Sequence, residues 1–299
     1  MATAREMKLR IRSIKNISQV TRALEAVSAS RVRKAEQAVK ASRPYANKAW
    51  QVLRHLSDQP ARDWVHPLLE SRQEVRNILT LIVTGDRGLA GAYNSNIIRF
   101  TLEHMRQQPA TVSYLIVGRK GRDVLIRRGV DIRAEFSQLP AEPSFADVSA
   151  IGRLAIDAYL AAEVDQVLLF YTDFVSLLRQ IPTVKQLLPL EVGDVAGRVE
   201  GEGLAAGVAT DRPPAAYIYE PGQEELVEFI VPRFTQLQIY QAIQESLASE
   251  HAARMVAMRN ATDNAQDLAS SLQLEYNKAR QQAITSEMLD IVGGVEAQA

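Results

Sequence analysis

The stretch Arg233–Val292 contains no Gly and no Pro, so nothing in it is expected to interrupt a helix. An α-helix rises about 1.5 Å per residue, and a helix over this stretch would be about 90 Å long, more than twice the diameter of a small domain. Helices inside globular proteins usually span about 8 to 20 residues. The sequence therefore predicts a helix that projects out of any globular part of the chain.

The spacing of apolar and small residues in this stretch indicates that the helix pairs with a partner. Such residues recur at alternating steps of three and four, which is the period of a coiled coil. The series is Leu237, Tyr240, Gln244, Leu247, His251, Met255, Met258, Thr262, Ala265, Leu268, Leu272, Tyr276, Ala279 and Ala283. Because Gln, His and Thr stand where a strong zipper has Leu or Ile, we expect a shaft held by several partners. The alternative is a helix that lies along its own domain.

A second long helix is predicted over Arg5–Leu56. The same steps connect Ile11, Ile14, Ile17, Thr21, Leu24, Ser28, Val32, Ala35, Val39, Ser42, Ala46, Ala49, Leu53 and Leu56. Pro44 is the single interruption, and it should bend the helix because it lacks an N–H and its ring clashes with the preceding turn.

The middle of the chain reads as alternating strands and helices. Strands are expected at Asn77–Thr84, Thr111–Val117, Val130–Phe136 and Val164–Thr172, and helices at Asn94–Gln107, Gly121–Arg128 and Phe145–Ala162. This βαβα order is typical of a mostly parallel sheet. A further extended stretch is expected at Val175–Pro189, a mobile loop at 193–214 and a last strand at Ala216–Glu220.

The predicted fold is therefore of the α/β class. It combines a long antiparallel coiled coil of the N- and C-terminal helices with a Rossmann-like, mostly parallel α/β domain. Antiparallel pairing follows because one domain joins the ends of both helices. The expected divisions are 1–57 for the first helix, 58–222 for the α/β domain and 223–299 for the second helix.

The first strand is followed by Gly85, Gly88 and Gly91, but their spacing fits neither a dinucleotide-binding nor a Walker phosphate motif. We interpret them as a strand-to-helix turn with Asn94 or Ser95 as the helix N-cap. An enzyme built on the α/β domain would need to bind nucleotide without such a motif.

Other catalytic chemistry is also hard to place. The chain has no Cys, and His55, His66, His104 and His251 have no second ligand at metal spacing, so they are expected on the surface or in the coiled-coil seam. Asp86 and Asp173, near strand ends, are interpreted as turn or cap residues. The sequence indicates no catalytic residue, no metal site and no cofactor.

Charge is balanced overall but not locally. The chain has 35 Lys and Arg against 35 Asp and Glu, yet residues 1–57 contain thirteen basic residues and three acids. A basic coiled coil could bind nucleic acid, although only Tyr45 and Trp50 are aromatic in this segment, which leaves no stacking platform. The alternative is a solvated helix face or one that meets an acidic protein cavity. No run of 18 apolar residues suggests a membrane span.

Several segments in order give the chain a family resemblance. They are Arg10–Ala29, Thr84–Ile97 (TGDRGLAGAYNSNI), Gly118–Gly129 (GRKGRDVLIRRG), Leu247–Asn264, Tyr276–Gln281 (YNKARQ) and Ile284–Gly294. With these motifs the chain resembles the gamma subunit of the rotary F-type ATP synthases from end to end. Val295 departs from the usual Ala, and Leu24 and Ala26 from a frequent Met.

The resemblance implies a function and a set of partners. The two helices would form the central rotor shaft inside a ring of three alpha and three beta subunits. The α/β domain would contact the epsilon subunit and the c-subunit ring, with delta, a and b reached through these partners. One copy would serve each complex, peripherally at the cytoplasmic face of the bacterial plasma membrane. It would transmit proton-driven rotation to the catalytic beta subunits and have no active site or cofactor of its own.

The resemblance also implies site residues. Arg259, Arg280 and Gln281 would contact the beta subunits, whose carboxylates suit guanidinium groups. Tyr217, Tyr219 and Glu220 would lie near the rotor ring and epsilon. Ile291, Val292 and Val295 would form an apolar tip that turns in a bearing.

Overall fold

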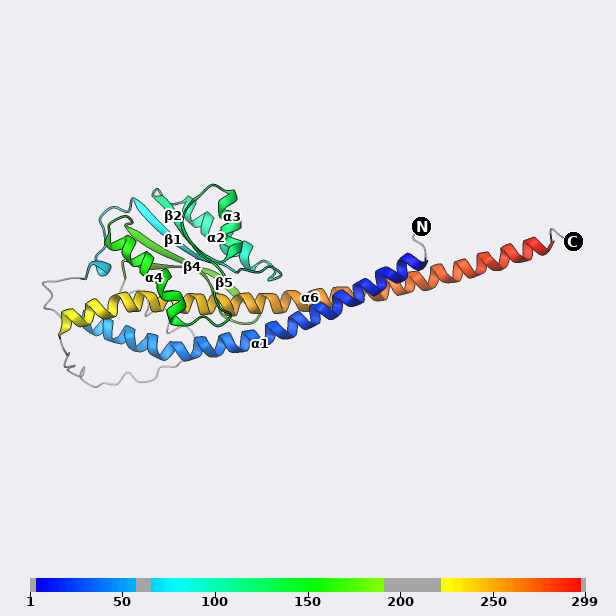
Figure 1. The fold of residues 1–299 in the computed structure, drawn as a ribbon, viewed down its shortest axis with the longest axis horizontal. Coiled ribbons are helices and arrows are strands. Elements are labelled where there is room, and N and C mark those ends of the chain that lie inside the picture. Colours follow the sequence, from blue (N-terminus) through cyan, green and yellow to red (C-terminus); the bar gives the residue numbers. More distant parts are fainter. Residues whose placement is uncertain (1–3, 58–65, 191–221, 297–299) are drawn as a thin grey trace.

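The computed structural model describes residues 4–57, 66–190 and 222–296. Two long helices, α1 (Ala4–Ser57) and α6 (Gln223–Glu296), lie side by side and run antiparallel, with an α/β unit against one flank of α6 (Figure 1). We call the helix pair the shaft and residues 66–190 the foot. The expected loop at 193–214 and the expected strand at Ala216–Glu220 lie outside the described residues.

The foot contains one five-stranded sheet in the order β3-β2-β1-β4-β5. Its strands are β1 (Asn77–Val83), β2 (Thr111–Val117), β3 (Asp131–Phe136), β4 (Gln166–Phe174) and β5 (Gln180–Leu188). The first four are parallel, and β5 is antiparallel to β4. The predicted mostly parallel Rossmann-like sheet is confirmed, and the extended stretch after Phe174 is its edge strand.

Helices cover both faces of the sheet. The helices α2 (Tyr93–Arg106) and α3 (Arg119–Arg127) pack on one face, where Ile78, Ile82 and Phe170 are buried. The other face meets α4 (Phe145–Leu160) and α6, and a short 3-10 helix (Pro67–Leu69) closes its edge. Because α6 belongs to the core of the foot and to the shaft, it joins the two parts of the molecule.

The coiled-coil seam follows the predicted series only in part. Val32, Thr262 and Ala265 are buried as expected, but Ile17 and Leu268 are 51% exposed. An α-helix has 3.6 residues per turn, so a strict series of threes and fours drifts around its surface. Next to Leu268, Ala269 is buried in its place.

Both long helices contain a proline. The helix α1 continues through the exposed Pro44, so this residue does not end it. The helix α6 begins at Gln223, ten residues before the stretch without Gly and Pro, and it continues through Pro232. Packing of Val227 and Val231 in the foot core, 5% and 0% exposed, offsets the backbone hydrogen bond that Pro232 cannot donate.

Candidate functional site

The loop between β1 and α2 differs from the expected capped turn. Helix α2 starts at Tyr93, and its N-cap residue Ala92 makes no side-chain cap bond. Asn94 instead accepts a hydrogen bond from the backbone N–H of Gly85 through its Oδ1, at 2.8 Å. The prediction of Asn94 or Ser95 as N-cap is therefore wrong, because the Asn94 side chain holds the start of the loop and not the start of the helix.

The neighbouring turn leads from β2 into α3, and the free N–H groups at a helix N-terminus can bind an anion. Here the protein uses those groups itself. The N–H of Arg119 donates to Asp86 Oδ1 at 3.0 Å, that of Lys120 to Gly85 O at 3.1 Å, and that of Gly121 to Thr84 Oγ1 at 2.9 Å. Asp86 was interpreted from the sequence as a turn residue. Its carboxylate lies at the N-terminus of α3, where an external anion could otherwise bind.

Gly118 fixes how closely these two turns approach. Its φ is 95°, and a Cβ there would lie 2.1 Å from the backbone oxygen of Thr84. Only glycine fits both the backbone conformation and the space. The carboxyl ends of β1 and β2 are therefore held in contact by backbone and by Thr84 and Asp86.

An ion pair from α6 lies above the carboxyl end of β1. The side chains of Glu250 and Arg254 form a salt bridge one helical turn apart and are 9% and 11% exposed. The Arg254 guanidinium also donates to the backbone oxygen of Gly88 at 3.2 and 3.3 Å. A Cβ at Gly85 would lie 2.8 Å from the Glu250 carboxyl carbon, so the loop and the carboxylate are in close contact.

Burial and this ion pair change the ionisation of nearby side chains. Burial, and then the charges of Arg254 and Arg31, lower the pKa of His251 to about 4, so its ring is neutral at physiological pH. Burial raises the pKa of the Tyr93 phenol, and the Glu250 carboxylate raises it further. Among the described residues, no group of three or more His, Asp and Glu side chains could hold a metal ion.

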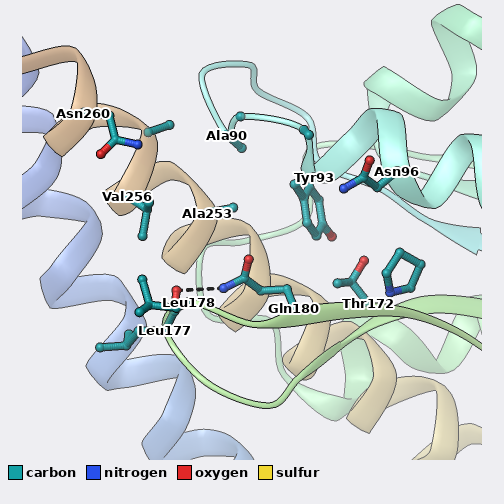
Figure 2. A pocket seen from close by; sticks show the side chains of 14 residues that line it. Ala90, Tyr93, Asn96, Thr172, Leu177, Leu178, Gln180, Ala253, Val256 and Asn260 are labelled. Atoms are coloured by element: carbon teal, nitrogen blue, oxygen red, sulfur yellow. Dashed lines mark hydrogen bonds between the residues drawn. The ribbon is translucent and has the colours of Figure 1, made fainter. Parts of the chain in front are cut away.

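Two cavities flank the ion pair. One, of about 240 Å³, lies between the β1–α2 loop, the β4–β5 hairpin and α6 (Figure 2). Its walls include Tyr93, Thr172 and Val256, and Gln180 Nε2 closes one side by donating to Leu177 O at 2.7 Å. The other, of about 490 Å³, opens between the strand ends and α6 and includes Arg31 of α1.

The histidines have structural roles. His66 is 6% exposed, and its Nδ1 accepts from the N–H of Leu68 at 3.1 Å, so it is a buried cap and not a surface or seam residue as expected. His251 lies in the seam, 7% exposed. His104 packs its ring against Phe170, with centroids 5.5 Å apart. The side chain of His55 lies outside the description.

The residues predicted to contact beta subunits do not form one cluster. Arg259, Arg280 and Gln281 are all exposed on α6. Arg280 and Gln281 are neighbours, but Arg259 lies about 30 Å away along the helix axis. Ile291, Val292 and Val295 are in the helical end of α6, although nothing is described of their side chains, and Tyr217, Tyr219 and Glu220 lie outside the described residues.

Sequence reasoning missed Glu250 and Arg254, and Ser246 and Ser249 beside them. A usable signal existed, because Glu at i and Arg at i+4 is a favourable helical pair and it surrounds the predicted seam residue His251. What the sequence did not show is that α6 presents this face to the foot and not to solvent.

The projecting helix pair and the α/β domain, whose α3 N-terminus is bonded by the protein's own residues, indicate the class of this protein. It is a shaft with an attached foot, held together by a shared apolar core and by buried polar contacts. None of the described helices is long and apolar enough to cross a membrane.

Comparison with known proteins identifies the family within this class. A family model described as ATP synthase matches residues 3–298. ATP synthase gamma chains from Dehalococcoides mccartyi (strain BAV1) and Chloroflexus aurantiacus (strain J-10-fl) are 43% and 41% identical, over 99% of this chain and of each relative. The chain belongs to the ATP synthase gamma chain family.

Solved structures support the fold. A chain of the Euglena gracilis mitochondrial ATP synthase, in its OSCP/F1/c-ring assembly in rotational state 3, matches with a TM-score of 0.66 and 20% identity, over 99% of this chain and 94% of that one. A chain of the Tetrahymena thermophila central stalk and c-ring matches with a TM-score of 0.60 and 23% identity, over 81% and 99%. The family assignment leaves the alternative of a nucleic-acid-binding coiled coil without support.

Proposed function

We propose that this chain is the central rotor shaft of a proton-translocating F-type ATP synthase. It carries the rotation of a membrane ring to the catalytic beta subunits and so couples proton flow to ATP synthesis. The observation that carries the proposal is the projection of α6. This helix starts in the core of the foot and extends beyond the N-terminal end of α1 (Figure 1), where all the side chains of residues 280–286 are exposed.

The coupling follows from differential contact. A rotating shaft changes the state of surrounding subunits only if it contacts them unequally, because equal contact with all states shifts no equilibrium. The surface of the shaft differs from side to side around its axis, since the foot lies on one flank of α6 and α1 on another (Figure 1). The thickness of the shaft also changes along its length, because α6 continues without a helical partner past the N-terminal end of α1 (Figure 1).

The shaft surface is suited to enclosure by other proteins. The helix α1 exposes Leu9, Val20 and Val27 at 61%, 59% and 49%, and α6 exposes Leu274 and Leu289 at 72% and 67%. Exposed apolar residues gathered on one element mark protein contact surfaces. We assign this surface to a ring of three alpha and three beta subunits.

The remaining partners follow from the same assignment. The foot contacts the epsilon subunit and the c-subunit ring, with delta, a and b reached through these partners. There is one copy in each complex, peripheral at the cytoplasmic face of the bacterial plasma membrane. We infer that the chain itself is non-catalytic, because Gly85, Gly88 and Gly91 have the spacing of neither a dinucleotide-binding nor a Walker phosphate motif.

Within this function the site residues have separate roles. Arg280 and Gln281 contact one beta subunit through the exposed end of α6, and Arg259 makes a second contact nearer the foot. Tyr217, Tyr219 and Glu220 face the rotor ring and epsilon, and Ile291, Val292 and Val295 turn in the apolar bearing.

Co-purification tests the assignment. A tagged copy of this chain, expressed in place of the native one in its own host, is expected to isolate alpha, beta and epsilon subunits in the ratio three, three and one. Isolation of the chain with nucleic acid, or with none of these subunits, would overturn the proposal.

Replacing Arg280 and Gln281 together by Ala is expected to slow ATP turnover of the assembled complex about ten-fold. Charge-assisted hydrogen bonds contribute about 1.5 to 3 kcal/mol, enough to change a rate by this factor when they form and break in each rotation. Reversing the charge of Arg259 is expected to slow ATP turnover more than neutralising it, because a carboxylate would then face a carboxylate. The measurements are steady-state hydrolysis and proton pumping, with assembly checked on native gels.

The control is Asn277→Ala with Lys278→Ala, which removes one amide and one cation from exposed positions of the same helix. Control complexes are expected to turn over at the wild-type rate. Equal rates for both double variants would show that Arg280 and Gln281 are only solvated positions.

A further inference from the structure

The larger of the two cavities lies where both helices of the shaft meet the foot. Its volume is about 490 Å³, and its walls come from α1, from the carboxyl ends of β1 and β2, from residues 138–141 after β3, and from α6. Pockets that bind small molecules usually have volumes of about 300 to 1,000 Å³. The cavity is therefore large enough for a small ligand, and the chemistry of its lining indicates which kind.

The lining has more positive than negative charge. Its charged residues are Arg31, Arg87, Arg119, Arg254, Asp86 and Glu250. Within the described residues only one of the four arginines, Arg254, forms an ion pair, and its partner is Glu250. Asp86 accepts from the backbone N–H groups of Arg119 and Gln138, at 3.0 and 2.8 Å. Four cations against two carboxylates leave an excess of two positive charges in the lining.

His251 adds a hydrogen-bond donor to the same lining. This residue is 7% exposed and neutral at physiological pH. Its one hydrogen bond within residues 4–57, 66–190 and 222–296 joins Nδ1 to Arg254 Nη1 at 3.3 Å. A guanidinium group only donates, so Nδ1 accepts and the proton of the neutral ring is on Nε2. The Nε2–H group is therefore a buried donor without an acceptor in the described part of the chain.

We propose that this cavity binds a small divalent oxyanion of the inorganic phosphate class, held by the His251 Nε2–H group and by the guanidinium groups of Arg31 and Arg119. The free polar groups of the lining are donors, and an oxyanion accepts through several oxygens. Guanidinium groups suit phosphate because two parallel N–H groups can donate to two oxygens. The exposed Arg87 adds to the attraction of an anion.

Charge also selects the size of the anion. A phosphate group carries about 1.5 to 2 negative charges at pH 7, which matches the excess of two positive charges in the lining. A nucleoside triphosphate has several charged phosphate groups, so its charge exceeds that of the lining. The site is therefore expected to take free phosphate and not ATP.

The bound anion links both helices of the shaft to the foot. Arg31 belongs to α1, His251 to α6 and Arg119 to α3. One turn along α1 from Arg31, Lys34 forms an exposed ion pair with Glu142 of the foot at 2.8 Å. Phosphate adds a less exposed link next to this pair and reduces the repulsion between the arginines. A ligand that binds only the folded chain also stabilises it against unfolding.

Titration calorimetry of the purified full chain with inorganic phosphate tests the proposal. The ionic strength is held constant with sodium chloride, so that only specific binding gives a saturable heat. Arg31→Gln and Arg119→Gln are each expected to weaken the affinity at least about ten-fold, because each removes charge-assisted hydrogen bonds. The backbone N–H of Arg119 still donates to Asp86 in its variant. If one variant does not fold, the other carries the test.

The matched controls are Arg33→Gln and Arg127→Gln. Both arginines are exposed, they lie on the same helices α1 and α3, and neither lines the cavity. Both control variants are expected to bind phosphate with the wild-type affinity. Equal weakening in the variants and in the controls would show a general effect of net charge, and this result would overturn the site.

The histidine rings give a second readout that reports the position of the anion. In the full chain labelled with ¹⁵N-histidine, phosphate is expected to shift the nuclear magnetic resonance signal of His251 Nε2. His66 is the control, because its Nδ1 is bonded to the N–H of Leu68 and its side chain does not line the cavity. A His251 signal that stays in place while phosphate binds would overturn the assignment.

Other anions separate the possible ligand classes. Acetate, a monovalent carboxylate, is expected to bind at least about ten-fold more weakly than phosphate, because it neutralises one charge where phosphate neutralises two. ATP is expected to give no heat. Tighter binding of acetate or ATP than of phosphate, or no saturable binding of phosphate, would overturn the proposal. The inference goes beyond the rotor function and does not depend on it, since co-purification tests that function separately.

Discussion

Single polar side chains in this protein repeatedly take the place of absent backbone partners. Thr84 and Asp86 bond the N–H groups at the start of α3, and Ser246 and Ser249 bond Thr172. Asp165 does the same at the entrance to β1, where its Oδ2 accepts from the N–H groups of Arg76 and Asn77, both at 2.9 Å. A buried polar group without such a partner would cost about 1 to 3 kcal/mol, so each of these positions tolerates little change.

Asp165→Asn is expected to destabilise the chain by about 2 kcal/mol, because its hydrogen bonds are charge-assisted. Besides the two amides, Arg72 Nη1 donates to Asp165 Oδ1 at 2.8 Å, and the aspartate side chain is only 14% exposed. The matched control is Glu74→Gln, whose partner Arg76 is 80% exposed and whose loss should cost less than about 1 kcal/mol. Urea unfolding followed by circular dichroism measures both, and equal costs would contradict the prediction.

The loss of unfolding free energy caused by Asp165→Asn should also depend on pH. Burial alone would raise the pKa of the Asp165 carboxyl, but the hydrogen bonds from Asn77, Arg72 and Arg76 outweigh it and lower the pKa. A lowered pKa in the folded state stabilises the protein above the unfolded value of about 3.9, and this contribution is lost as the pH falls through the folded value. The stability difference between wild type and variant is therefore expected to be constant near neutral pH and to shrink below about pH 4. A difference that persists in acid would show that the charge is not the cause.

At the scale of elements, α6 shows how one helix serves different neighbours along its length. Near its start it is part of the foot core, with Val231 and Ile243 buried. In its middle it packs against α1 through small or polar residues such as Ala252 and Thr262, and toward its end its side chains are exposed. Because the buried face changes with the neighbour, no single hydrophobic stripe runs along the whole helix.

Thr21 of α1 and Thr262 of α6 are expected to be energetically coupled. Their hydroxyl oxygens are 2.7 Å apart in the buried seam, and each also approaches a carbonyl oxygen of its own helix. Thr262→Val should cost about 1 kcal/mol because one partner loses its bond. The double variant with Thr21→Val should cost less than the sum, since two apolar groups of the same shape leave nothing unpaired.

A double-mutant cycle on the full chain, measured by urea unfolding, tests this coupling. Thr285→Val is the control, because Thr285 is exposed and bonds only its own helix at Gln281 O. Additive costs would mean that the Thr21–Thr262 contact does not stabilise the shaft.

In the whole molecule, the shaft helix α6 lies across the carboxyl ends of the strands of the foot, where it contacts the loop after β1 and the end of β4. The N–H of Arg119 at the start of α3 donates to Asp86, and the N–H of Thr172 near the end of β4 donates to Ser246 of α6. The domain that in other proteins holds a ligand thereby holds a helix that leaves the domain. This arrangement connects the compact foot to the long shaft.

The isolated chain is accordingly expected not to bind or hydrolyse ATP. The loop after β1 has neither a dinucleotide-binding nor a Walker phosphate motif, and its first residue, Gly85, is in close contact with the Glu250 carboxylate. Titration calorimetry of the purified chain with ATP is expected to show no heat of binding up to millimolar nucleotide. Micromolar affinity, or turnover that survives removal of contaminating partners, would contradict this expectation.

Local sequence patterns predict most of the helices and strands of this protein. The period of three and four residues predicted both long helices, and the alternation of apolar runs with helical patterns predicted the parallel sheet, with β2 placed at Thr111–Val117 to the residue. These signals are local, because helix period, strand-length apolar runs and the absence of Gly and Pro act between residues that are near in sequence.

How the helices and strands pack against one another depends on contacts between distant parts of the chain. It determined that Glu250 and Arg254 are buried against the foot, that Asn94 bonds the loop and not the helix end, and that Leu268 is exposed while Ala269 is buried. Each of these depends on residues far apart in the chain. Which face of α6 is buried is set by the free energy of packing against α1 and the sheet, and no local pattern in the sequence contains that information.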